Sequence, residues 1–225
     1  MRILLIILPF LLIGCAHVQE PIPMEGQYVT SKVKNIGIVV STAQGGNFVP
    51  FGNIGLLDLA VIAGSNSQLT DHLEALDVTE FQQITEMVTQ KFQHSDLQYT
   101  IIPTPVAWDE LPSNGEKQGF ATKDFSQFKQ EYKVDHILVL RLVSVGVKRS
   151  YYSIAPTSPP TAYASIEGAL ISLKDHSLKW YYSDENVVTI PDPWDEPDLK
   201  FPNVTSSVYQ IINTASETLV DDIKS

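Results

Sequence analysis

Ser126 and Lys129 have the spacing with which an enzyme can place an amine one helical turn from a nucleophilic hydroxyl group. Ser31 and Lys34 repeat this S-x-x-K pattern. The pattern fixes only two positions, and the sequence lacks the S-D-N, K-T-G and G-x-S-x-G motifs that accompany such a serine in hydrolases. We therefore interpret Ser126 as part of an exposed polar helix face, and we predict no catalytic residue.

The histidines and carboxylates do not have the spacing of a metal site. The five histidines form neither an H-E-x-x-H motif nor an H-x-H pair. His136 falls at the start of an expected strand and His176 in an expected turn, so local structure explains both. Four acidic residues between prolines lack the regular spacing of a calcium loop: Asp192, Asp195, Glu196 and Asp198. The sequence predicts no metal site and no cofactor.

Cys15 is the only cysteine among the 225 residues, so the chain cannot form an internal disulfide or a thiolate metal site. It follows Arg2 and an apolar run over residues 3–13, which is the pattern of an export signal. The run is shorter than the roughly 20 residues that a membrane-spanning helix needs, and Pro9 interrupts it. We expect a cleaved signal and not a membrane span.

Residues Leu12-Ile13-Gly14-Cys15 resemble the lipobox of bacterial lipoproteins. The resemblance implies that Cys15 carries a diacylglyceryl group, that cleavage occurs before it, and that its new amine receives an acyl chain such as palmitate. Ala16, where enteric bacteria use Asp to retain a lipoprotein in the inner membrane, favours the outer membrane, with the protein facing the periplasm. The alternative is an ordinary secretory signal that is cut elsewhere, with Cys15 incidental.

Three segments are expected in the chain. Residues 1–14 form the signal peptide, and residues 15–32 form the lipidated N-terminus and a flexible tether that contains two prolines and one glycine. Residues 33–225 form a single α+β domain. The formal net charge of −11 opposes binding to phosphate backbones, so we expect no nucleic-acid partner. The lipid bilayer is the expected partner of the acylated Cys15.

The apolar patterns predict the element order β-α-β-α-β-β-β-α, a mixed sheet of about five strands with helices packed on it. The expected strands and helices follow the periodicity of Val, Ile, Leu and Phe along the domain. The strands are 33–41, 97–104, 135–149, 161–173 and 178–190, and the helices are 78–95, 122–134 and 203–223.

Residues 54–63 are almost wholly apolar but too short to cross a bilayer. They form either a buried helix or an exposed docking element. Large exposed apolar patches are uncommon, so the buried helix is the favoured reading.

The segments VDHILVLRLVSV (134–145) and ALISLKDHSLKWYYSDE (169–185) resemble the amino-terminal domain of TolB and the related domains of the envelope lipoproteins LpoB and CsgG. In that group, as here with Trp180, a central strand precedes a hairpin whose last strand carries a tryptophan. The resemblance implies the fold. Residues 42–68 and 150–160 depart from the group's pattern.

Aromatic residues in the last strands are the candidate contact surface, since Tyr and Trp are favoured at protein interfaces. The candidates, from residues 150–163 and the following hairpin, are Tyr151, Tyr152, Tyr163 and Trp180. We predict a non-enzymatic binding or scaffold lipoprotein, an accessory subunit of an envelope complex, whose partner is another envelope protein or a second copy. The alternatives are a carrier of a lipophilic ligand with residues 54–63 as one wall, and a hydrolase of cell-wall or lipid substrates.

Overall fold

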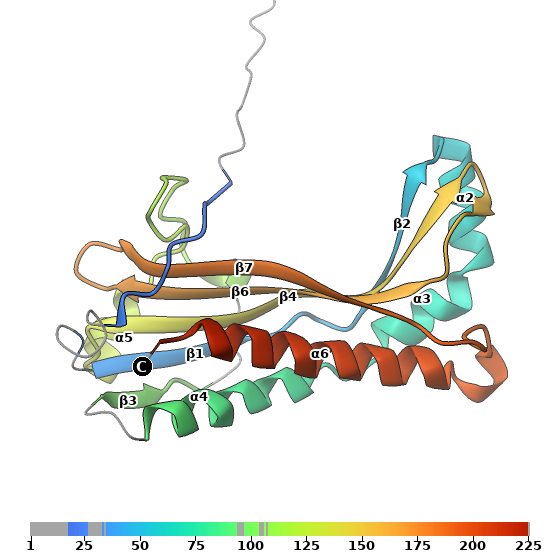
Figure 1. The fold of residues 1–225 in the computed structure, drawn as a ribbon. Coiled ribbons are helices and arrows are strands. Elements are labelled where there is room, and N and C mark those ends of the chain that lie inside the picture. Colours follow the sequence, from blue (N-terminus) through green and yellow to red (C-terminus); the bar gives the residue numbers. More distant parts are fainter. Residues whose placement is uncertain are drawn as a thin grey trace, which may run out of the picture.

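A computed structural model describes residues 18–26, 33, 35–93, 97–103, 106 and 108–224. Cys15 and the expected signal peptide lie outside these residues. The described part folds around one mixed sheet with helices on both faces, which confirms the predicted α+β class (Figure 1).

The sheet has seven strands, where the sequence predicts about five. Its path runs β3-β1-β4-β6-β7, and two further strands, β2 and β5, pair with β4 off this path. Antiparallel pairing joins β4 to β6 and β6 to β7, and β1 is parallel to both of its neighbours. The strands are β1 (Asn35–Ser41), β2 (Asn47–Asn53), β3 (Gln98–Ile101), β4 (His136–Tyr152), β5 (Ala155–Pro156), β6 (Thr161–Ser172) and β7 (Leu178–Thr189).

Strand β4 has 17 residues and runs the length of the sheet, about 55 Å at 3.3 Å per residue. The first half of β4 pairs with β1, and the second half pairs with β2 on the same edge. The link between β1 and β2 turns at Gly45, where φ is +74° and an added Cβ would lie 2.4 Å from the carbonyl oxygen of Glu74. Glycine is therefore required at this turn.

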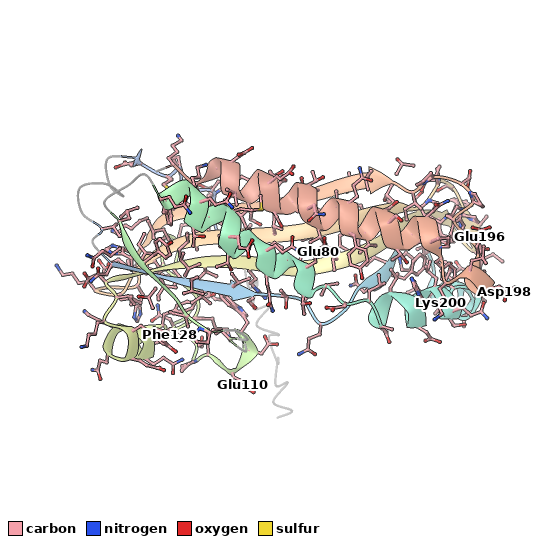
Figure 2. The ribbon with its side chains drawn as sticks, turned by 90° about the horizontal axis from the view of Figure 1, so that it is seen from below. Glu80, Glu110, Phe128, Glu196, Asp198 and Lys200 are labelled. Carbon is pink, nitrogen blue, oxygen red and sulfur yellow. The ribbon has the colours of Figure 1, made fainter. Side chains whose placement is uncertain are left out.

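Two layers of helices bury the two faces of the sheet. One face is covered by α4 (Ile84–Phe92) and α6 (Pro202–Asp222), which lie side by side in Figure 2, and by the 3-10 helix η1 (Thr79–Gln83). The other face is covered by α5 (Ser126–Tyr132), which carries the labelled Phe128, and by the loop before it. Strand residues alternate between the two cores, as Val39 and Val40 do.

Trp180 belongs to the core beneath α6, which corrects its prediction as a contact residue. Its side chain is 0% exposed, and its indole Nε1 donates a hydrogen bond to Asp222 Oδ2 at 2.6 Å. Gly168 on the neighbouring strand leaves room for the ring, because a Cβ there would lie 2.2 Å from the indole. The tryptophan is thus a packing residue that joins the sheet to the C-terminal end of α6.

The segment 42–68 folds as β2, helix α2 (Leu56–Ser65) and the start of helix α3 (Ser67–Glu74). The preferred reading of residues 54–63 as a buried helix is wrong. In α2 only Ile62 is buried, and both Leu56 and Leu57 are more than 80% exposed. The run has no polar face, so its sequence does not indicate which side of the helix is buried. For this reason the sequence could not distinguish a core helix from a surface helix.

Residues 18–26 lie on the domain and do not extend freely, which shortens the tether expected over residues 15–32. Ile22 forms an isolated antiparallel bridge with Tyr181 of β7, with N-to-O distances of 2.9 and 3.0 Å. Met24 is buried in the core beside the C-terminus, where its sulfur accepts a hydrogen bond from the Lys224 amide at 3.2 Å. No helix within the described residues is both long enough and apolar enough to cross a membrane.

The buried His136 predicts a loss of stability in acid. Burial lowers the pKa of His136 below 6.5, against an opposing effect of the Asp135 carboxylate. Below pH 6.5 the unfolded chain therefore binds a proton more readily than the folded chain, and the free energy of unfolding falls by at most about 1.4 kcal/mol per pH unit. Urea unfolding at pH 7.5 and 5.5 measures this difference.

We expect His136→Gln to reduce the difference between the two pH values. His72→Gln is the control, because His72 is less buried and its pKa is lowered by burial and by Lys200. An equal or larger reduction in the His72 variant would show that His136 is not the main acid-sensitive group.

Candidate functional site

Exposed apolar side chains gather at one end of the molecule, which we call the apolar tip. They come from β2, from α2 and from the end of β4 with its turn into β5. The members are Val49, Phe51, Leu56, Leu57, Leu59, Val61, Tyr152 and Ile154. A cluster of this kind on a folded domain marks an interaction surface.

Hydrogen bonds hold α2 against the sheet, so the tip is a built structure. The Gly55 amide donates to Asp58 Oδ2 at 2.9 Å, which caps the start of α2. The Ser153 hydroxyl, in the turn after β4, donates to the other oxygen of Asp58 at 3.0 Å. Asn66, at the end of α2, lies 3.5 Å from the Tyr151 hydroxyl. Both ends of the helix are thereby tied to the turn that carries Tyr152.

The tip and the N-terminal segment lie at opposite ends of the sheet (Figure 1). Ile22 is held by Tyr181, and Tyr181 is in register through Ala169 with Val139 of β4. From Val139 to Tyr152, β4 runs 13 residues, or about 40 Å. A membrane anchor ahead of residue 18 would therefore be attached at the end of the domain farther from the tip.

Of the four predicted contact residues, only Tyr152 is exposed. Tyr151 and Tyr163 are buried, so they are corrected along with Trp180. The Tyr163 hydroxyl donates to the Asn47 side chain, and burial raises the pKa of Tyr163. Alternation along the strands explains the difference, because Tyr151 and Tyr152 point to opposite faces of β4. The aromatic pattern of the sequence did not show which of these side chains reach solvent.

The chain around the tip is acidic. Residues 47–74, which form β2, α2 and α3, contain three Asp or Glu and no Lys or Arg. Figure 2 places Glu196 and Asp198 at this end of the molecule, beside Lys200. The nearest cation of β4 is engaged within the chain, since Arg149 donates to the Ser158 carbonyl oxygen at 2.9 Å and its guanidinium lies 4.7 Å from the Trp194 ring. The tip therefore combines apolar side chains with negative charge.

A second feature is a cavity of about 370 Å³ at the opposite end, on the face covered by α5. Its floor is formed by Ala169 and Ile171 of β6 and by Leu178 of β7. The loop over residues 116–122 forms one wall, and Val18 lies at the rim. Backbone hydrogen bonds fix the loop, as from Leu178 to the Gly119 carbonyl oxygen at 2.9 Å. The volume lies within the range of ligand sites in proteins.

Several polar groups around this cavity are paired with one another. Arg141 donates to Glu167 at 3.1 Å, and its guanidinium stacks 4.3 Å from the centroid of Trp108. Burial and the Glu167 carboxylate raise the pKa of Tyr181 to about 12, so this phenol stays protonated at neutral pH. The Gly119 amide donates to Gln19 at 2.7 Å. These contacts leave the apolar floor as the dominant surface.

Ser126 lies near the cavity and contacts His176 rather than Lys129. Its hydroxyl is 3.1 Å from His176 Nε2, and His176 Nδ1 is 3.2 Å from the side-chain oxygen of Asn114. However, Asp124 approaches the same Nε2 at 3.4 Å and accepts a hydrogen bond from the Ser126 amide at 2.7 Å. In catalytic triads the acidic group orients the other ring nitrogen. We interpret this network as the cap of α5, tied to the β6–β7 turn.

A metal ion, and a lipophilic ligand with residues 54–63 as one wall, are the two kinds of ligand considered from the sequence. Within the described part of the chain, no group of three or more His, Asp or Glu side chains could hold a metal ion. Residues 54–63 do not line any of the three cavities of about 370, 500 and 840 Å³, so they form no wall of these.

No family model matches the sequence, and no curated protein matches it. Solved structures give low-scoring matches. Lipoprotein GNA1162 from Neisseria meningitidis has 13% identity and a TM-score of 0.33, over 80% of this chain and 99% of that one. PelC from Paraburkholderia phytofirmans, described as a dodecamer, has 6% identity and a TM-score of 0.41, over 92% and 95%. A minor lipoprotein from Acinetobacter baumannii has 5% identity and a TM-score of 0.31, over 84% and 94%. Lipoproteins are among the chain's structural neighbours.

Proposed function

We propose that the protein is a non-enzymatic lipoprotein of the bacterial outer membrane that faces the periplasm and binds another envelope protein through its apolar tip. Acylated Cys15 attaches one end of the domain to the bilayer. The tip at the other end is free to contact a neighbouring complex, of which the protein is an accessory subunit. The exposure of Leu56 and Leu57 carries this proposal, because burial of the tip side chains by a partner would remove them from water.

The charge of the tip favours a protein partner over a lipid surface. Helices that lie on membranes are rich in Lys and Arg on their polar face, whereas α2 carries no basic residue and one carboxylate, that of Asp58. The acidic surround also opposes self-association through two tips, since like charges would face each other. The complementary partner presents an apolar groove with a basic rim.

Anchoring raises the effective concentration of the tip at its target. Acyl chains confine the domain to one membrane leaflet, so a modest intrinsic affinity is sufficient for capture of a partner in the same membrane. Ile22 follows Cys15 by seven residues, which span at most about 25 Å, and Ile22 is fixed to β7. The reach of the tip therefore comes mainly from the length of β4.

Substitution of the tip tests the proposal. Chemical cross-linking in cells should join the full-length protein to its partner and give an adduct of higher mass. We expect the double variant Leu56→Ser and Leu57→Ser to reduce the amount of this adduct at least tenfold. The free energy of unfolding should change by no more than about 0.5 kcal/mol per residue, because both side chains are exposed in the folded protein. Quantitative immunoblotting of the adduct, with urea unfolding of the purified variant, measures both quantities.

The control is Ile101→Ser, which removes an exposed apolar side chain from the edge strand β3. This variant should leave the adduct unchanged. Full adduct formation by the tip variant would refute the tip as the binding surface. An adduct of twice the chain's own mass would identify a second copy as the partner and would contradict the charge argument.

A further inference from the structure

We propose that the cavity beside Val18 binds one aliphatic acyl chain, either of the lipid on Cys15 or of a separate lipid molecule. The inference goes beyond partner binding at the tip and places a second, independent site at the other end of the sheet. Only the first of the two sources depends on the proposed acylation of Cys15.

The lining of the cavity is mainly apolar, and two of its residues have small side chains. Ala169 and Ala121 are both nearly buried, and their small size leaves the space above the sheet open. The rings of Phe120, Phe125 and Trp108 form the walls, and the last two lie 5.8 Å apart between centroids. Aliphatic and aromatic walls of this kind accept methylene groups, which each gain favourable free energy on leaving water.

Three charged residues line the cavity, namely the exposed Glu116 and Lys117 of the loop and Glu167 of β6. Glu167 is neutralised by Arg141, and Arg141 is in turn stacked on Trp108. Lys117 lies 3.9 Å from the centroid of the Phe120 ring, at the side of the loop. A lipid with its chain on the floor could therefore place an anionic head group near Lys117 without leaving a charge buried and unpaired.

The start of the domain brings the expected lipid close to this cavity. Val18 lies at the rim and is 81% exposed, although it is apolar. Its position follows from the bridge between Ile22 and Tyr181, whose side chain also lines the cavity. Cys15 precedes Val18 by three residues, or at most about 11 Å. An acyl chain on Cys15 thus begins within reach of the apolar floor.

The test uses a fluorescent fatty acid, dansyl-undecanoic acid, with the full chain in two forms. The Cys15→Ser protein has no attached lipid, so it should bind the probe with enhanced dansyl emission. Thr122→Trp places a large ring at the mouth of the cavity and should weaken binding at least tenfold. Gln118→Trp, at another exposed position of the rim, should also weaken probe binding at least tenfold. This second variant tests the cavity even if Thr122→Trp does not fold.

The matched control is Thr214→Trp, an exposed threonine of α6 on the other face of the sheet, which should bind the probe unchanged. The acylated protein distinguishes the two sources: binding at least tenfold weaker than in the Cys15→Ser form identifies the attached chain, and equal binding identifies a separate lipid. Intact-mass measurement of both forms reports acylation independently. No binding by the Cys15→Ser protein, or rim variants that bind as well as the control, would overturn the proposal.

Discussion

Trp180→Ala is expected to lower the free energy of unfolding by about 3 to 5 kcal/mol, the usual cost of removing a large buried aromatic ring. The ring is 0% exposed and fills the space that Gly168 leaves beneath α6. The variant also removes the indole donor to Asp222, at 2.6 Å, and leaves that carboxylate without this hydrogen bond. Urea unfolding followed by far-UV circular dichroism measures the change.

Tyr152→Ala is the control, because Tyr152 was predicted from the same aromatic pattern but is 65% exposed. We expect its free energy of unfolding to change by less than about 0.5 kcal/mol. Trp180→Phe should fall between the two, since it keeps a ring but loses the hydrogen bond. Equal stability of the Trp180→Ala and Tyr152→Ala proteins would contradict the assignment of Trp180 to the core.

Cys15→Ser is expected to move the protein from the membrane fraction to the soluble fraction and to abolish labelling with a radioactive acyl precursor. The full chain has a formal net charge of −11, so it is repelled by anionic head groups and offers no electrostatic alternative to the lipid. Three acyl chains hold a protein far more firmly than one, because each buried methylene contributes about 0.8 kcal/mol. Fractionation of cells with immunoblotting measures the distribution.

Ala16→Ser retains the cysteine and controls for the effect of a substitution at the processing site. This variant should stay in the membrane fraction and keep its acyl label. Membrane retention of the Cys15→Ser protein at the level of the control would refute the lipid anchor, whatever the tip binds.

The periodic segments of the sequence predicted the central architecture. In the first half of residues 136–152, the odd-numbered and the even-numbered positions are both mainly apolar. This segment forms the central strand β4, which is covered on both faces. The apolar stripe of residues 203–223 likewise predicted α6. In these elements the hydrophobic pattern alone determines which residues are buried, so one sequence was sufficient.

The tip could not be predicted in the same way, because its strands and helix depend on contacts that are distant in sequence. β2 contains Pro50 and Gly52, which weaken a strand, yet it pairs with the distal half of β4. β5 has only two residues. Strand propensity does not detect such elements, and seven strands therefore replace the expected five.

The cavity could not be predicted from the sequence either, because its lining residues come from five separate parts of the chain. Val18, Trp108, Phe125, Ala169 and Leu178 become neighbours only through the pairing of β6 with β7 and the bridge at Ile22. Each of them is an ordinary apolar residue in its own segment. Of the residues now placed in the apolar tip, the sequence singled out Tyr152, as a candidate contact residue, and the apolar run that forms α2.

Site-specific photocross-linking at position 57 of the full-length protein in cells tests the central claim most directly. A photoreactive residue in place of Leu57, which lies in the first turn of α2 and is 83% exposed, should give one major adduct with a protein other than this chain. The same residue at position 101, on the edge strand β3, should give little of it. An adduct that forms equally from positions 57 and 101, or none from position 57, would contradict the proposal that the apolar tip is the binding surface.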